Sequence, residues 1–136
     1  MAVPVVWIVS GDPQIRWLIE LNLRERGISV WGAESIAQLL ASAPEPQLVV
    51  LDLDDDEGRW VMAEALRRQP WGQSVPLVAL LNTPPSSRRL AALEPLDWLE
   101  KPFAMGNLLT LVRNALDLEP PANTAPPPVP GETHTV

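Results

Sequence analysis

The sequence predicts an α/β fold, a three-layer sandwich in which helices cover both faces of a parallel β-sheet. Three observations predict it. Five short apolar runs alternate with five stretches whose apolar residues recur at helical spacing. The connections between them are short, and alternating strands and helices are typical of parallel sheets with helical crossovers. The length of 136 residues suits one domain.

The first strand and the first helix carry clear local signals. Residues 3–9 form an apolar run typical of a strand that is buried on both faces. Asp12 and Pro13 predict a helix start, because aspartate caps free backbone N–H groups and proline fits the first helical position. Apolar residues then follow helical spacing up to Gly27, a residue type that commonly ends helices.

The middle of the chain supplies the next elements. Residues 28–31 predict a second strand, and residues 34–42 predict a short helix closed by two prolines. Residues 48–53 form the most apolar strand, which ends in an acidic cluster that extends to Glu57. Residues 59–68 predict a helix with an apolar face that ends before a proline.

The remaining elements complete five strand–helix units. Residues 75–81 predict the fourth strand, and a proline pair opens a short helix over residues 86–93. Residues 96–99 predict the fifth strand. Residues 104–116 predict the last helix, because their leucines and valine fall on one face.

The last part of the chain differs in composition. Six of the 16 prolines lie between residues 119 and 136. Such a segment buries too little apolar surface to order itself. We therefore expect a folded body over residues 1–118 and a disordered, proline-rich tail over residues 119–136, with no output domain after it. The spacing of Pro127 and Pro130 formally fits a PxxP ligand, a pattern that often occurs by chance.

Composition excludes several classes of protein. Without cysteine there are no disulfides, thiolate nucleophiles or cysteine–metal sites, and the only histidine, His134, lies in the tail. A net charge of −7 opposes nucleic-acid binding. No apolar run is long enough to span a membrane, and no basic leader precedes the first strand. We expect a cytoplasmic protein that binds neither nucleic acid nor membrane.

Charged residues gather where the strands end. Asp12 follows the first strand, Asp52 ends the third, and Lys101 follows the fifth. In open parallel sheets, ligands bind at the carboxyl ends of the strands. Aspartate can act as a nucleophile that gives an aspartyl phosphate, and a lysine can hold the phosphoryl oxygens. Alternatively, Asp52 and Lys101 form a purely structural ion pair. In either case we expect the Lys101 ammonium to point toward Asp52.

Residues 4–117 resemble the receiver domain of bacterial response regulators. The stretch 5–16 is similar to the family's first strand and acidic turn, 48–53 to its phosphoacceptor strand, and 99–103 to its lysine–proline–phenylalanine turn. The resemblance implies a flavodoxin-like five-stranded sheet in the order 2-1-3-4-5 and a cis bond before Pro102. It also implies Asp52 as phosphoacceptor, Lys101 as its phosphate-contacting partner and Trp98 at the position of the rotating aromatic switch.

The chain departs from the family pattern at three positions. Ser10 and Gly11 stand where the family has two acids that help to hold a divalent metal. Leu81 stands where the family has a hydroxyl residue that binds the transferred phosphoryl group. The acids that remain for a metal are Asp12, Asp52 and Asp54. Because phosphoryl transfer depends on positioning and electrostatic stabilisation, we expect a weak Mg²⁺ site and no resident cofactor.

The leading hypothesis is a stand-alone, divergent receiver domain in a two-component phosphorelay. It would be a non-enzymatic protein-interaction module with a degenerate phosphorylation site at Asp52. The first alternative is a working phosphoacceptor that uses Asp52 with Mg²⁺, and the second is a small flavodoxin-like enzyme or nucleotide binder. The expected partner is a histidine kinase or another signalling protein. Arg88 and Arg89 either begin a solvated helix or belong to a homodimer interface through the fourth helix, fifth strand and fifth helix.

Overall fold

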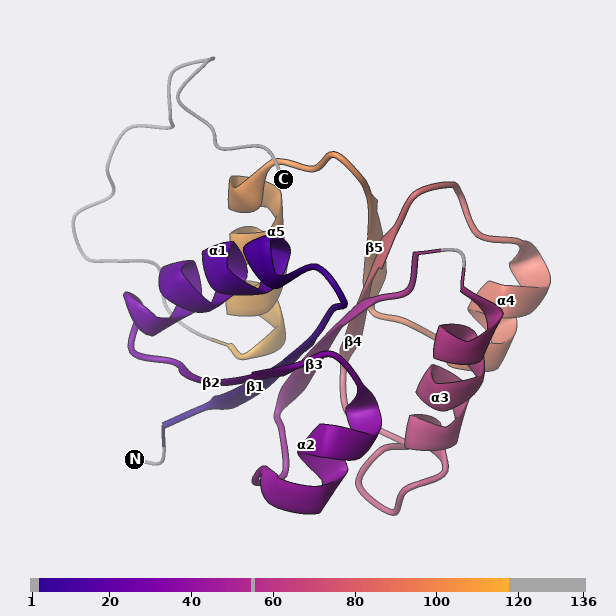
Figure 1. The fold of residues 1–136 in the computed structure, drawn as a ribbon, viewed down its shortest axis with the longest axis horizontal. Helices are drawn as coiled ribbons and strands as arrows, with labels where there is room; N and C mark the ends of the chain where they lie inside the picture. The colour runs from indigo at the N-terminus through magenta and orange to yellow at the C-terminus, as the bar shows by residue number, and fades with distance from the viewer. Residues whose placement is uncertain (1–2, 55, 118–136) are drawn as a thin grey trace.

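The computed structural model describes residues 3–54 and 56–117. Ten elements alternate along the chain, as the sequence predicts, and Figure 1 shows them in sequence order. They are β1 (Val5–Val9), α1 (Pro13–Arg24), β2 (Ser29–Ala33), α2 (Ile36–Ser42), β3 (Leu48–Asp52), α3 (Glu57–Arg67), β4 (Leu77–Leu81), α4 (Ser87–Leu93), β5 (Asp97–Glu100) and α5 (Met105–Ala115).

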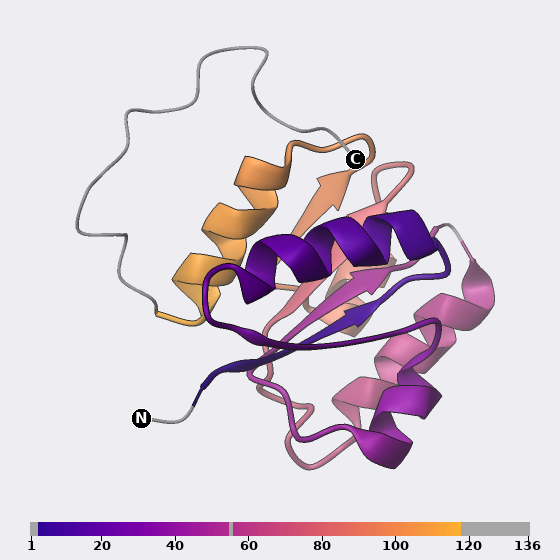
Figure 2. The same cartoon turned by 60° about the vertical axis from the view of Figure 1, so that its left-hand side comes forward.

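The five strands form one parallel sheet in the order β2-β1-β3-β4-β5. The predicted three-layer fold and strand order are therefore confirmed. Helices α1 and α5 lie side by side on one face, while α2, α3 and α4 cover the other (Figures 1 and 2). Every residue of β3 and β4 is buried, because both strands are central and both faces of the sheet are covered.

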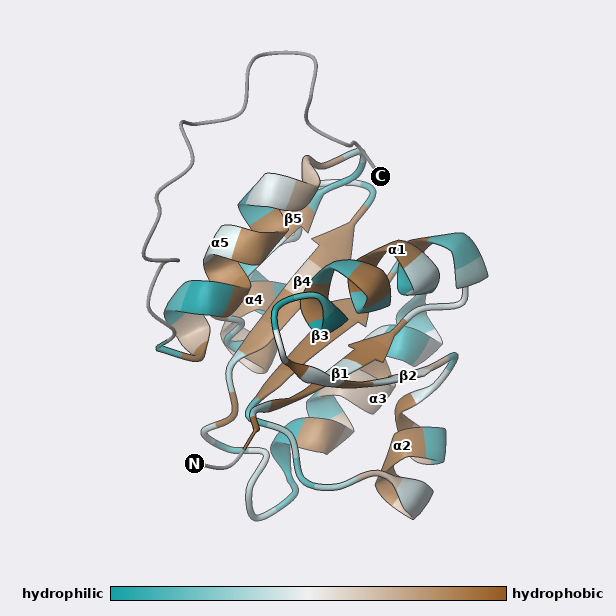
Figure 3. Ribbon diagram, turned by 90° about the vertical axis from the view of Figure 1, so that its left-hand side faces the viewer, coloured by the Kyte–Doolittle hydropathy of each residue, from teal (hydrophilic) through white to brown (hydrophobic). Residues whose placement is uncertain are grey.

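Two apolar cores follow from this layering. One joins the sheet to α2, α3 and α4 and includes Trp7, whose indole N–H donates to the carbonyl of Pro44 at 2.9 Å. The other joins the sheet to α1 and α5. Figure 3 shows the apolar residues concentrated in the central strands, while the helices carry polar residues on their outer faces. The apolar runs of the sequence are therefore the buried strands, and the apolar residues at helical spacing are the faces that the helices turn toward the sheet.

Element boundaries differ from the predicted ones by up to three residues, and the start of α3 matters most. Asp56 caps α3 by accepting from the backbone N–H of Arg59 at 3.2 Å. The helix therefore begins at Glu57 rather than at residue 59. This earlier start places Arg59 in the first turn, next to the carboxyl ends of the strands. Strand β3 also ends one residue before the predicted limit, at Asp52.

Arg67 ties three segments together on the α3–α4 face. Its guanidinium donates to four backbone carbonyls that lie after α3, before β4 and at the end of α4. The acceptors are Gly72, Val75, Leu93 and Glu94. Burial lowers the pKa of Arg67, opposed by the charge of Glu94. An arginine suits this position because its guanidinium presents several donors in a fixed fork.

The sequence also predicts a domain end and a proline-rich tail. The predicted division at residue 118 and the proline-rich tail over 119–136 lie outside the described residues. Among the helices of residues 3–54 and 56–117, none is long and apolar enough to cross a membrane.

Candidate functional site

Asp52 lies at the carboxyl edge of the sheet, as the last residue of β3. It is only 1% exposed, one of two buried polar residues in the described chain. Strands β1 and β4 flank it, with Asp52 in register with Leu80. Because all five strands are parallel, their carboxyl ends bring the neighbouring loops to this same edge.

Lys101 reaches Asp52 from the end of β5, as the sequence predicts. Its Nζ lies 2.5 Å from Oδ1 of Asp52, and it also pairs with Oδ1 of Asp54. The lysine side chain is 14% exposed. The Lys101–Pro102 bond is cis, as the resemblance implies. The single lysine of the chain is thus held between two carboxylates.

Ser10 supplies the second contact of the Asp52 carboxylate. Its hydroxyl donates to Oδ2 of Asp52 at 2.7 Å, and both residues are buried. From the sequence, Ser10 is recognisable only as the loss of an acid. Its role as a donor depends on β1 and β3 being neighbours, as the strand order implies, and on the register that places Val9 opposite Leu51. The serine therefore stabilises the ionised carboxylate that it contacts.

The three ionisable groups have shifted pKa values. Burial raises the pKa of Asp52 above its ordinary value of 3.8, against the hydrogen bonds from Lys101 and Ser10. Burial also acts to raise the pKa of Asp54, but Lys101 outweighs it and the net shift is downward. Burial acts to lower the pKa of Lys101, but the two carboxylates raise it above 10.5. Asp54 and Lys101 are therefore the more firmly ionised members.

Two further residues at this edge were not singled out from the sequence. Asn82, after β4, donates from Nδ2 to Oδ1 of Asp54 at 3.3 Å. Arg59 donates from Nη1 to the main-chain carbonyl of Asp52 at 3.2 Å. The helix pattern that contains Arg59 was recognised, but the pattern does not indicate where a long side chain ends. The site therefore contains two cations around Asp52 and Asp54.

The other predicted site residues lie close by without contacting the Asp52 carboxylate. Asp12 caps α1, where its Oδ1 accepts from the backbone N–H groups of Gln14 and Ile15 at 2.9 and 3.3 Å. This is the capping role that its position before Pro13 predicts. Leu81 is buried at the end of β4, and Trp98 of β5 is half-buried against the same core.

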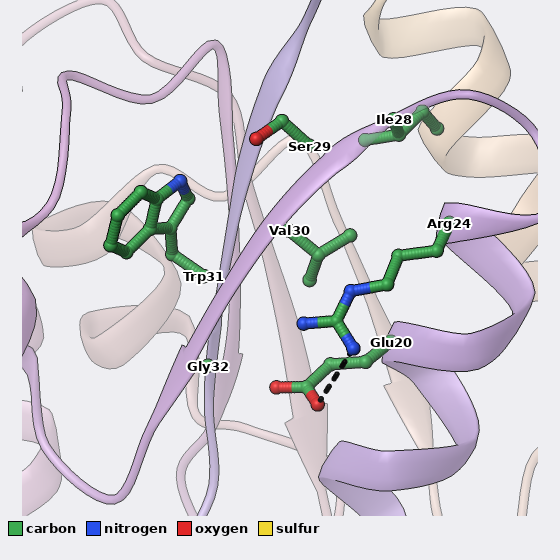
Figure 4. Close-up of a pocket in the computed structure, with 7 residues that line it drawn as sticks. All are labelled: Glu20, Arg24, Ile28, Ser29, Val30, Trp31 and Gly32. Carbon is green, nitrogen blue, oxygen red and sulfur yellow. Dashed lines mark ion pairs between the residues drawn. The ribbon is translucent and has the colours of Figure 1, made fainter.

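One of the hollows that border the sheet adjoins the site. A cavity of about 280 Å³ is lined by residues that include Asp52, Asp56 and Arg59. A larger, open hollow of about 490 Å³ lies at the edge strand β2, away from Asp52. Figure 4 shows that Glu20 and Arg24 of α1 extend over β2 there and pair with each other at 3.8 Å. The chemistry of the edge near Asp52 makes it the candidate site.

Comparison with known proteins places this geometry in context. No family model matches the chain. The KDP operon transcriptional regulatory protein KdpE of Escherichia coli K12 is 33% identical over 128 residues, which cover 91% of this chain and 56% of that protein. The chain therefore spans little more than half of that relative. The chemotaxis protein CheY4 of Vibrio cholerae superposes with a TM-score of 0.73 at 22% identity, covering 84% of this chain and 99% of that one.

The chain therefore has the fold of solved response regulators. A further receiver domain, that of the sensor histidine kinase PA1611 of Pseudomonas aeruginosa PAO1, superposes with a TM-score of 0.69 at 24% identity. The match covers 85% of this chain and 99% of that one, and the PA1611 structure holds a magnesium ion in its active-site cleft. In the present chain, two cations lie beside the carboxylates at the corresponding edge of the sheet.

Proposed function

We propose that this receiver domain is a signalling module of a two-component phosphorelay whose phosphorylation site at Asp52 is degenerate. One observation carries the proposal: the Asp52 carboxylate is buried and already held by Lys101 and Ser10, while Arg59 binds the adjacent main-chain carbonyl. The acceptor and the lysine are kept, but Ser10 and Gly11 offer no carboxylate for a metal.

The residues at the two switch positions, Leu81 and Trp98, also support a degenerate site at Asp52. Leu81 has an aliphatic side chain and can donate no hydrogen bond to a phosphoryl oxygen. Trp98 packs half-buried against the core of the α2–α3–α4 face, and burial of a large ring favours one fixed position. We propose that Trp98 serves as a packed side chain rather than as a moving switch.

The output of such a module would come from protein contacts and not from catalysis. A histidine kinase or another cytoplasmic signalling protein is the proposed partner. The predicted homodimer surface consists of α4, β5 and α5. The two arginines of α4 differ in whether their side chains are available to contact a second subunit. Arg89 already pairs with Glu57 of α3, and its guanidinium lies 4.8 Å from the centre of the Trp60 ring. We therefore propose that Arg88, and not Arg89, is the arginine of α4 that would contact a second subunit.

The second candidate function is a working phosphoacceptor that uses Asp52 with Mg²⁺. The geometry between Asp52 and Lys101 favours it, because a lysine beside the carboxylate could hold phosphoryl oxygens after transfer. Asp54 and Asp12 would then have to leave their present hydrogen bonds to serve as ligands.

Incubation with acetyl phosphate and MgCl₂, followed by intact-mass spectrometry, distinguishes the two candidates. We expect no stoichiometric mass increase for the wild-type chain. The matched control is Asp52→Asn, which keeps the size of the side chain and removes the nucleophile. A full phosphoryl mass increase in the wild type that is lost in Asp52→Asn would refute the degenerate site and establish the working phosphoacceptor.

A further inference from the structure

The Arg59 guanidinium lies across the carboxyl ends of β1 and β3. A Cβ atom placed on Gly11 would come within 2.4 Å of Nη2 and 3.4 Å of Cζ of Arg59. Nη1 donates to the main-chain carbonyl of Asp52 at 3.2 Å. The guanidinium therefore occupies the space directly in front of Gly11, and a side chain at residue 11 would require it to shift.

Local structure explains why Arg59 reaches this place. Asp56 caps α3, so that Arg59 falls in the first helical turn, beside the carboxyl edge of the sheet. Gly11 has no side chain, which leaves room for the guanidinium in front of β1. The missing side chain at Gly11, between β1 and α1, and the long side chain of Arg59 in α3 are therefore complementary in space. The two residues are 48 positions apart in the sequence.

The residues at this edge do not fit a magnesium ion. Mg²⁺ requires near-octahedral oxygen ligation, commonly with one or two carboxylates. Here Asp52 contacts Lys101 and Ser10 through its two carboxylate oxygens, and its main-chain oxygen accepts from Arg59. Asp12 caps α1. Within the described part of the chain, no three acids or histidines are grouped so as to hold a metal ion.

Two cations already lie beside the two carboxylates at the centre of this edge. Asp52 and Asp54 contribute two carboxylates, and Lys101 and Arg59 contribute two cations. The Lys101 ammonium contacts both acids directly, and the charge of Arg59 also favours the ionised form of Asp54. A divalent cation brought to this edge would be repelled by both resident cations, and the repulsion is strong where water is partly excluded.

We propose that the Arg59 guanidinium takes the place of the divalent cation at this edge, so that the receiver domain neither binds nor responds to Mg²⁺. The inference rests on the proposed function, because it explains how a receiver-type site persists without its metal. It assigns to Arg59 a role that its position in a helix pattern does not suggest. The guanidinium supplies positive charge between β1 and β3 and occupies the space in front of Gly11.

The test is metal binding by the full chain without any phosphoryl donor. Free Mn²⁺ is followed by electron paramagnetic resonance for the wild type, Arg59→Ala, Gly11→Asp and the double variant. We expect no saturable binding by the wild type or Gly11→Asp, since the introduced carboxylate would pair with Arg59. The double variant should show saturable Mn²⁺ binding that the wild type lacks, because it gains a carboxylate and loses a cation. MgCl₂ should compete for that site.

Two controls make the result specific. Arg68→Ala removes an exposed arginine at the far end of the same helix and should behave as the wild type. Thermal melting verifies that each variant folds. If the double variant with Arg59→Ala does not fold, Arg59→Gln replaces Arg59→Ala in the Gly11→Asp background. Saturable Mn²⁺ binding by the wild type, or no gain in a folded double variant, would overturn the proposal.

The same samples separate this inference from the proposed function. If the wild type binds no metal but acetyl phosphate still modifies Asp52, the degenerate site is refuted and the role of Arg59 stands. If the wild type binds metal and Asp52 stays unmodified, the role of Arg59 is refuted and the degenerate site stands.

Discussion

At the scale of single residues, the ionised state of Asp52 depends on its neighbours. Burial makes the charged form of this carboxylate costly, as its raised pKa indicates. Lys101 and Ser10 offset part of that cost by direct contact. Removal of one partner would leave a buried group without compensation, which is more damaging than loss of an exposed ion pair. The buried cluster is therefore both the candidate site and a determinant of stability.

Lys101 allows an unusually clear test of that view. The chain has one lysine, no tyrosine and no cysteine. Above about pH 9, Lys101 is therefore the side chain expected to titrate. Its folded-state pKa lies above 10.5, because Asp52 and Asp54 outweigh the effect of burial. The stability from this raised pKa is fully present below 10.5 and is lost as the pH rises through the folded-state value.

We predict that the free energy of unfolding falls by up to about 1.4 kcal/mol per pH unit above the unfolded-state pKa. Urea denaturation at a series of alkaline pH values measures it. Lys101→Met serves as the control and should lose this dependence. A wild-type free energy of unfolding that does not fall above this pKa, or that falls with the same slope in Lys101→Met, would show that Lys101 is not held by the two acids.

At the scale of elements, close backbone approaches set the connection after α3. A Cβ on Gly72 would lie 1.9 Å from the carbonyl oxygen of Leu66, while Arg67 donates to the carbonyl of Gly72 itself. The turn between α3 and β4 is thus packed against the end of the helix. By contrast, a Cβ on Gly106 in α5 would meet nothing within 4 Å. The same substitution should therefore have opposite effects at the two glycines.

We predict that Gly72→Ala lowers the free energy of unfolding by about 1–3 kcal/mol, because the methyl group forces the turn away from α3. Gly106→Ala should raise it by about 0.5–1 kcal/mol, because alanine restricts the unfolded chain and favours the helix. Urea unfolding at neutral pH measures both. Equal effects of the two substitutions would contradict the close packing of this turn.

The element scale also shows what the sequence could and could not predict. The alternation of apolar runs and helical patterns predicted all ten elements, and the resemblance predicted the strand order. The pairing of Asp52 with Lys101 followed, because parallel strands bring their carboxyl ends together. The contacts of Arg59 and Arg67 could not be predicted, because a long side chain spans a distance that depends on the helix start and loop geometry.

At the scale of the whole molecule, the layered fold presents one edge at which five connections meet. The fold matches that of solved receiver domains over nearly the full length of those domains. Its site residues depart from the pattern that the resemblance implies, because Ser10 and Gly11 stand in place of acids and Leu81 stands in place of a hydroxyl residue. Arg59 lies beside Asp52 at this edge. A shared fold does not fix the chemistry of its site, so the proposed degenerate site at Asp52 has to be tested on these residues themselves.

The central claim is that this edge is fixed in one state and does not accept a phosphoryl group. Addition of beryllofluoride, a phosphoryl mimic, together with MgCl₂ to the isotope-labelled chain tests it most directly by amide NMR. The account predicts that the signals of Asp52, Leu81 and Trp98 keep their positions at saturating reagent. Saturable shifts at these three residues, absent from Asp52→Asn, would contradict it.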